Sequence, residues 1–196
     1  MKKIMLGSLL MLTCASASAQ VVMGGLKPWY ITYGSTTGAN VADLEGAVKR
    51  GGNMRMQSAH YFPQTVSFKV GEGASAKTVT ADYVLQVRDY KCGTVGSVKI
   101  RTEDYFLYGT SSPSYSTGIQ YEAPYKIERP NSAAGREWTA VCKGTRPADM
   151  IPVSALVPNV PYNITHEMVI VPIRQQIKAS QNKVNSSSPA PAAPTR

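Results

Sequence analysis

The chain has 196 residues, with 21 lysine and arginine residues against 12 aspartate and glutamate residues and a formal net charge of +9 at pH 7. This length predicts one domain. The excess of basic residues favours contact with anionic surfaces, acidic glycans or acidic proteins. Nucleic acid is not expected as a partner, because lysine and arginine never occur more than two in a row.

Residues 1–19 have the features of a bacterial secretory signal peptide. Lys2 and Lys3 form a positive start and an apolar run follows at residues 4–14. The small residues at 15–19 predict cleavage before Gln20. The apolar run is too short to span a bilayer, and no later stretch approaches the roughly 20 apolar residues required. We therefore expect an exported protein, in the periplasm or at the outer cell surface, with no transmembrane segment after cleavage.

The cysteines predict one disulfide. A lipid anchor at Cys14 is disfavoured, because Thr13 stands where a small residue is expected before a lipidated cysteine. Removal of the leader leaves Cys92 and Cys142, and two cysteines in an exported chain predict a bond between them. In the chain-entropy model, closing a loop of about 50 residues is worth roughly 4 kcal/mol. The alternative is two unpaired buried thiols; two cysteines alone predict no metal site.

Alternation of apolar and polar residues predicts a sheet. We expect strands at residues 29–33, 54–62, 65–70, 78–92 and 97–108, with an edge strand at 121–127 because of Pro124. Residues 42–49 are read as one or two helical turns, because Val41, Leu44 and Val48 share a helical face. The Gly, Ser, Thr and Pro residues at 109–118 predict a loop.

A short helix is predicted over residues 131–143. Asn131 or Ser132 provides its N-cap, and Gly144 is placed to end it. Arg136 and Glu137 are expected to face water. The stripe expected to face the sheet consists of Ala134, Trp138, Val141 and Cys142.

The C-terminal quarter predicts little compact structure. Residues 147–184 carry five prolines and are expected to form an extended arm, with a strand at 167–171 and a short helix at 173–183 when bound. The Ser, Pro and Ala residues at 185–196 predict a disordered tail. From Ile173 onward there are four basic residues and no acidic one, so this arm is a candidate for docking onto an envelope component.

Four short features within residues 28–146 carry a family resemblance. They are Trp29-Tyr30-Ile31, Tyr90-Lys91-Cys92, the strand at 97–108, and Pro130-Asn131-Ser132 followed by Trp138-Thr139-Ala140-Val141-Cys142. In these features the chain resembles the bacterial surface-adhesin protein E domain family. The resemblance implies an antiparallel sheet of about six strands, with the helix tied to one side by the disulfide, and a surface or envelope location. In the namesake, a lipoprotein, the domain binds host proteins such as vitronectin, laminin and plasminogen. This chain departs from it in its poor lipidation signal and its extra C-terminal residues.

No catalytic centre is predicted. The two histidines, His60 and His166, are each expected to be packed or at the surface, and no second histidine lies at metal-binding spacing. Glu103 and Asp104 are neighbours on a strand and so point to opposite faces. We expect no enzyme activity, no metal and no cofactor; a ligand buried beside His60 would argue for an enzyme after all.

Surface side chains are therefore the candidates for binding. Tyrosines suit interfaces because they bring a large contact area at a small entropic cost, and two cations on one strand face suit an acidic partner. The alternative is that the tyrosines build the core and the cations meet only water. One hypothesis is an adhesin-like module that binds a protein partner, either a host matrix protein or an envelope assembly component; another is an accessory subunit docked through the basic arm. The partner-binding candidates are Tyr105, Tyr108, Tyr115, Tyr121, Lys99 and Arg101.

Overall fold

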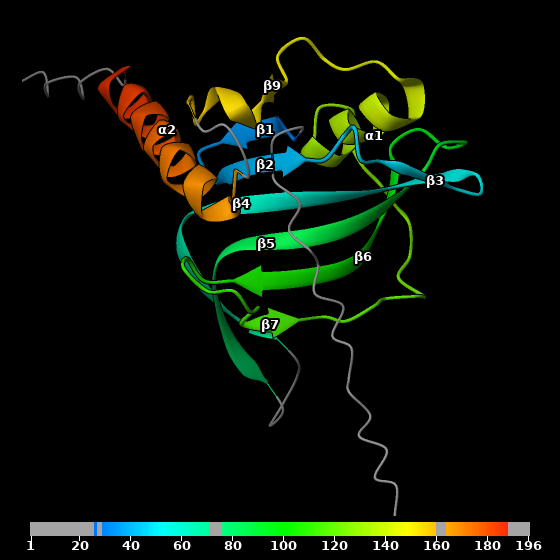
Figure 1. Cartoon of the computed structure of the whole chain (residues 1–196), viewed down its shortest axis with the longest axis horizontal. Helices are drawn as coiled ribbons and strands as arrows, with labels where there is room; N and C mark the ends of the chain where they lie inside the picture. Colours follow the sequence, from blue (N-terminus) through cyan, green and yellow to red (C-terminus); the bar gives the residue numbers. More distant parts are fainter. Residues whose placement is uncertain (1–25, 27–28, 71–75, 160–163, 188–196) are drawn as a thin grey trace, which may run out of the picture.

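The computed structural model describes residues 26, 29–70, 76–159 and 164–187. The expected signal peptide, Cys14 and the tail after Ser187 lie outside the described residues. A nine-stranded antiparallel sheet carries two α-helices, which confirms the α+β class (Figure 1). The elements are β1 (Tyr30–Ser35), β2 (Gly38–Ala42), β3 (Val48–Arg50), β4 (Asn53–Val70), β5 (Lys77–Lys91), β6 (Ser97–Phe106), β7 (Tyr115–Ser116), β8 (Lys126–Ile127), α1 (Ala133–Lys143), β9 (Ile151–Pro152), the 3-10 turn η2 (Val153–Ala155) and α2 (His166–Ser187).

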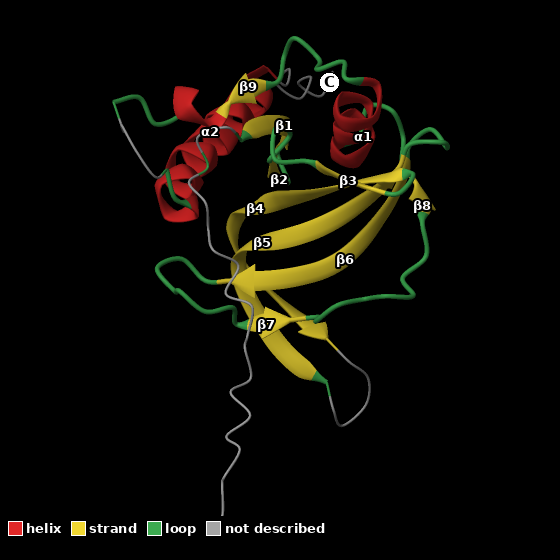
Figure 2. Cartoon of the chain, turned by 45° about the vertical axis from the view of Figure 1, so that its right-hand side comes forward, coloured by secondary structure: helices red, strands yellow, loops and turns green. Residues whose placement is uncertain are grey.

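The sheet follows the order β7–β6–β5–β4–β2–β1–β9, with β3 paired to β4 and β8 paired to β6. β4 and β5 form a long central hairpin, and the sheet is strongly curved (Figure 1). Both helices lie toward the β1 and β2 side, whereas β6 and β7 lie on the far side (Figure 2). The outer edge of β6 is therefore left to a loop, while the start of β6, at Val98, packs under α1.

Three local predictions need correction. The strands expected at 54–62 and 65–70 are one strand, β4, in which residues 62–65 lie opposite Asp82 alone. Such an irregularity tolerates Pro63, which has no N–H to donate. The helical turns expected at 42–49 are wrong: the chain leaves β2 through a turn and enters β3, which pairs with β4. Of the edge strand expected at 121–127, only Lys126–Ile127 form a strand, β8.

α1 matches its prediction closely. The Ser132 side chain accepts a hydrogen bond from the Gly135 N–H at 3.1 Å, and Gly144 adopts the left-handed conformation that ends the helix. A Cβ at Gly135 would stand 2.0 Å from the Arg129 carbonyl oxygen. Glycine is therefore required here by close backbone approach, which explains its place inside a helix.

The disulfide between Cys92 and Cys142 is confirmed and joins the end of β5 to the last turn of α1. Beside it, the Trp138 indole donates a hydrogen bond to the Lys91 carbonyl oxygen at 3.1 Å. A small apolar cluster fills the space between α1 and the sheet. It consists of Ala42, Met56, Tyr90, Val98 and Trp138.

The short helix expected at 173–183 is present as part of α2, without any bound partner. The strand expected at 167–171 is wrong, because α2 already begins at His166, and the extended arm is wrong from that residue onward. α2 continues through Pro172 and packs against the sheet as part of the main core. The disordered tail expected from residue 185 is also wrong for its first three residues, because the helix reaches Ser187. The helix contributes Val169, Ile170, Ile173 and Ile177 to a cluster with Tyr61, Tyr83, Leu85 and Phe106 of the sheet.

Candidate functional site

Residues 107–128, here called the edge segment, run along the outer edge of β6. Backbone N–H groups of Thr117 and Gln120 donate to the carbonyl oxygens of Glu103 and Arg101 at 3.0 and 2.7 Å. The Glu128 N–H closes the segment onto the Gly96 carbonyl at 2.9 Å. These bonds cover part of the sheet edge and place the segment's side chains on both sides of β6.

On one side of β6 two cations lie over two tyrosine rings. The Lys99 ammonium is 5.0 Å from the centroid of the Tyr125 ring, and the Arg101 guanidinium is 5.1 Å from that of Tyr121. The Lys99 ammonium also donates to the Tyr121 carbonyl oxygen at 3.3 Å. We call these four residues, Lys99, Arg101, Tyr121 and Tyr125, the cation–tyrosine surface.

A single carboxylate supports this surface from below. Asp89 accepts a bidentate hydrogen bond from Arg55 at 2.7 and 3.1 Å and contacts Arg101 at 3.5 Å. The Asp89 side chain is only 6% exposed, and the two guanidinium groups that contact it offset its charge. Two guanidinium groups therefore share one carboxylate, and Lys99 adds a further positive charge, so the surface remains positive.

The predicted binding residues divide into two groups. Lys99, Arg101 and Tyr121 come together, and Tyr121 is 70% exposed. Tyr105 and Tyr115 pack on each other instead, with ring centroids 6.0 Å apart. Burial and the neighbouring Glu103 carboxylate raise the pKa of Tyr105 to about 12. Tyr108 is exposed but lies apart, where its backbone N–H donates to Asp82.

A buried polar network under α1 was not foreseen. Glu137, expected to face water, is fully buried and accepts hydrogen bonds from Arg88 at 2.7 Å, Tyr90 at 2.5 Å and Thr32 at 2.7 Å. Arg88 is also buried, and its Nε and one terminal nitrogen donate hydrogen bonds to the Gln86 amide oxygen. Helical periodicity could not reveal this, because the partners come from β1 and β5.

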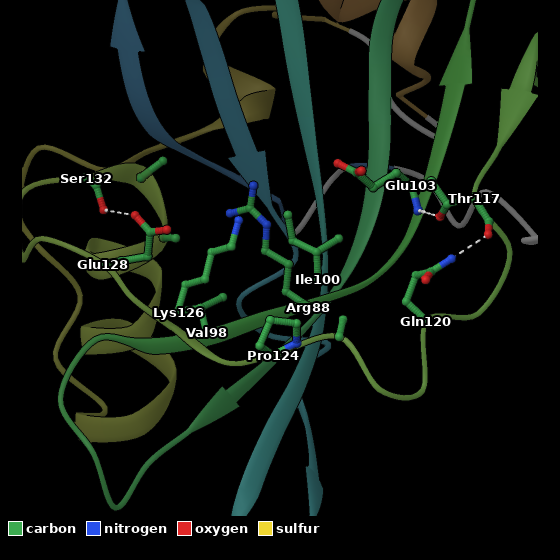
Figure 3. Close-up of a pocket in the computed structure, with 13 residues that line it drawn as sticks. Arg88, Val98, Ile100, Glu103, Thr117, Gln120, Pro124, Lys126, Glu128 and Ser132 are labelled. Carbon is green, nitrogen blue, oxygen red and sulfur yellow. Dashed lines mark hydrogen bonds between the residues drawn. The ribbon is translucent and has the colours of Figure 1, made fainter. Parts of the chain in front are cut away.

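A pocket of about 440 Å³ opens beside this network. Its walls are the start of α1 and the edge segment, and its floor is β6 with Arg88 (Figure 3). Figure 3 shows Ser132 and Glu128 at one end and Thr117 and Gln120 at the other. The lining residues are Arg88, Val98, Ile100, Glu103, Thr117, Gln120, Ala123, Pro124, Lys126, Glu128, Ser132, Ala133 and Ala134.

The two histidines are held by packing. His60 Nδ1 lies 3.0 Å from the Asn40 amide oxygen, and its ring lies edge-on to Phe62. His166 is buried at the start of α2, with Nδ1 2.5 Å from the Tyr61 hydroxyl. Burial lowers the pKa of both rings, to about 4 for His166. Among the described residues, no group of three or more His, Cys, Asp or Glu side chains is arranged to hold a metal ion.

No protein-family model, curated protein or solved structure matches this chain. Within the part of the chain that the structure describes, neither helix combines the length and apolar character needed to cross a membrane. The resemblance to the surface-adhesin protein E domain therefore stays a hypothesis that rests on the short sequence motifs.

Proposed function

We propose that this is an exported binding protein that recognises an acidic protein partner through the cation–tyrosine surface. The observation that carries the proposal is the pairing of Lys99 and Arg101 with two tyrosine rings at the sheet edge. Charge brings an acidic partner to the surface, and pre-positioned rings give contact area at a small entropic cost.

The arrangement also restricts the side chains before a partner arrives. A cation held over an aromatic ring gains about 0.5–1 kcal/mol at an exposed site. Asp89 further fixes Arg101, and the Asn53 amide donates to the Tyr125 hydroxyl at 3.1 Å. Less rotamer freedom is then lost on binding, which favours affinity.

Export to the envelope or the cell surface is part of the proposal. A disulfide suits an oxidising compartment, because cytosolic thiols are kept reduced, and the start of the sequence has the pattern of a secretory signal. The adhesin-like resemblance supports the same compartment and suggests host matrix proteins as the first partners to test.

The accessory-subunit hypothesis has lost its main motivation. It relied on a free basic arm, whereas α2 packs its apolar stripe into the core. Docking would then depend on the outer face of α2 or on residues 188–196, which lie outside the described residues. We therefore favour the cation–tyrosine surface.

The test is binding of the exported protein to immobilised vitronectin, laminin and plasminogen, and to envelope proteins of the producing organism, at physiological salt. We expect the double variant Lys99→Glu/Arg101→Gln to lose at least about tenfold in affinity, because one attractive charge becomes repulsive and the other is removed. Gln is used at position 101 because a carboxylate there would repel the buried Asp89. The control is Lys49→Glu/Arg50→Gln on β3, which makes the same charge change at exposed positions.

Three results would contradict the proposal. One is the absence of a partner in both sets of proteins. Another is equal binding by the two double variants, which would mean that net charge alone matters. The third is affinity that does not change between low and high salt, since contacts between exposed charges are screened by salt.

A further inference from the structure

The pocket between α1 and the edge segment combines hydrogen-bond donors with an apolar middle. Arg88 lies at its floor and is only 7% exposed. Three of the five guanidinium N–H groups are used by Gln86 and Glu137. The Tyr90 side chain also interacts with this guanidinium, so at most two N–H groups of the buried, permanently charged side chain remain for a ligand.

Lys126 adds a second cation to the same pocket. Within the described residues its ammonium has no hydrogen bond, ion pair or ring contact, unlike Lys99, which lies over Tyr125. Figure 3 shows the Lys126 and Arg88 side chains extending in the same direction from the floor. Lys126 and the Glu137-paired Arg88 thus lie on one side of the cavity.

The first turn of α1 contributes backbone donors. Ser132 accepts from the N–H groups of Gly135 and Arg136 through its side chain and its carbonyl oxygen. The N–H groups of Ala133 and Ala134 have no acceptor among the described residues, and both residues line the pocket. The start of a helix carries partial positive charge, so these backbone donors favour an anion in the pocket, as Arg88 and Lys126 do.

The pocket also holds two carboxylates, which keep their negative charge because, among the described residues, each accepts a hydrogen bond only from a neutral group. Glu103 accepts a hydrogen bond from the Gln86 amide at 2.6 Å, and Glu128 accepts one from the Ser132 hydroxyl at 3.3 Å. The surface between the two ends is apolar. It is formed by Val98, Ile100, Ala123 and Pro124.

We propose that this pocket binds a small ligand that carries a carboxylate on an apolar body. The carboxylate contacts Arg88, Lys126 and the start of α1, and the apolar part lies on Ile100 and Pro124. The volume of about 440 Å³ lies within the range of small-molecule sites. The source is either a free organic acid or the C-terminus of a short peptide. This site shares the edge segment with the cation–tyrosine surface but uses none of its four residues.

The experiment is an NMR titration of the isotope-labelled protein recovered after export, with four probes. Hexanoate and its amide test a free acid; N-acetyl-Ala-Leu and its C-terminal amide test a chain end. We expect each acid to shift the amide resonances of Ala133, Ala134 and Gly135, and each amide to bind at least about tenfold more weakly, because hydrogen bonds to a charged group are stronger. Comparison of the two acids identifies the source.

Two variants localise the site without touching the buried network. Lys126→Gln should weaken acid binding by about threefold, in line with an exposed charge pair. Ala123→Trp, in the edge segment, should abolish binding by filling the cavity. The matched control, Lys49→Gln, removes an exposed lysine from β3 and should bind like the parent protein.

The proposal is overturned if neither acid binds at 10 mM, roughly the weak limit for such ligands, or if acid and amide bind equally. It is also overturned if Ala123→Trp binds both acids normally. The variants at Lys99 and Arg101 should retain acid binding, so failure of this site and failure of the proposed function are separately visible.

Discussion

Glu137 shows how one residue can depend on partners far along the chain. It occupies a helix position with a polar side chain, yet it is fully buried against Arg88, Tyr90 and Thr32. Burying a charge is unfavourable unless the charge is paired and hydrogen-bonded. The three donors meet this condition, so the network joins α1 to the sheet through a charge that water does not reach.

The variant Glu137→Gln should therefore be strongly destabilised. It leaves the Arg88 charge buried without its counter-ion, and breaking such a pair costs about 3–5 kcal/mol. Urea denaturation followed by circular dichroism measures the loss in the free energy of unfolding. The double variant Arg88→Met/Glu137→Leu should recover much of it, because no lone charge remains. If the single variant is as stable as the parent, the buried pair is not formed in solution.

At the scale of elements, the two helices follow different rules. α1 begins and ends with local signals, the Ser132 cap and Gly144, and is tied down by the disulfide. α2 contains Pro172, which removes one backbone hydrogen bond within the helix. The apolar stripe of α2 offsets this cost, because Val169, Ile170 and Ile173 are almost completely buried in the core.

Removal of α2 should therefore unfold the domain. A chain that ends at Thr165 loses four buried apolar side chains and exposes Tyr61 and Tyr83. Burial of each large apolar side chain stabilises the fold by about 1.5–3 kcal/mol. The loss of all four therefore approaches or exceeds the free energy of unfolding of many domains. We expect the truncated protein to be insoluble or to show no cooperative transition when its thermal unfolding is measured. A soluble fragment with the parent's sharp transition would show that α2 is dispensable, as a loosely attached arm would be.

At the scale of the whole molecule, the stability should decrease with acidification. Burial lowers the pKa of His166 from 6.5 to about 4. Between these values the unfolded chain binds a proton that the folded chain does not, so falling pH favours unfolding. Burial opposes ionisation of Asp82, but hydrogen bonds from Thr65, Tyr108 and Arg174 outweigh it and lower the pKa of the carboxyl. This contribution is lost at still lower pH.

The free energy of unfolding should thus decrease from pH 7 to about pH 4, with His166 contributing about 3 kcal/mol. Urea midpoints measured across this range provide the test. In His166→Gln the free energy of unfolding should depend less on pH, because the residue no longer titrates. In His60→Gln the pH dependence should change less, since His60 is the less buried of the two histidines. A parent protein whose stability stays constant from pH 7 to 4 would contradict the burial of His166.

The pairing of the cysteines, most strands, the α1 helix and the grouping of Lys99 with Arg101 were predictable from the sequence. Each depends on neighbours within a few residues: alternation along a strand, a cap three residues from its donor, or two cysteines left after export. The resemblance, the export signal and the binding role remain predictions. They concern other molecules or residues that the structure does not describe.

Only the tertiary structure decided the place of Glu137, the course of α2 and the existence of the pocket. The sequence predicts a strand before Pro172 and a short helix after it, whereas the core contains Val169, Ile173 and Ile177 on one continuous helix. Glu137 and Arg88 stand 49 positions apart, and no local pattern encodes their contact. Burial of a charge and closure of a cavity depend on long-range packing, whereas strand and helix ends depend on the nearest residues.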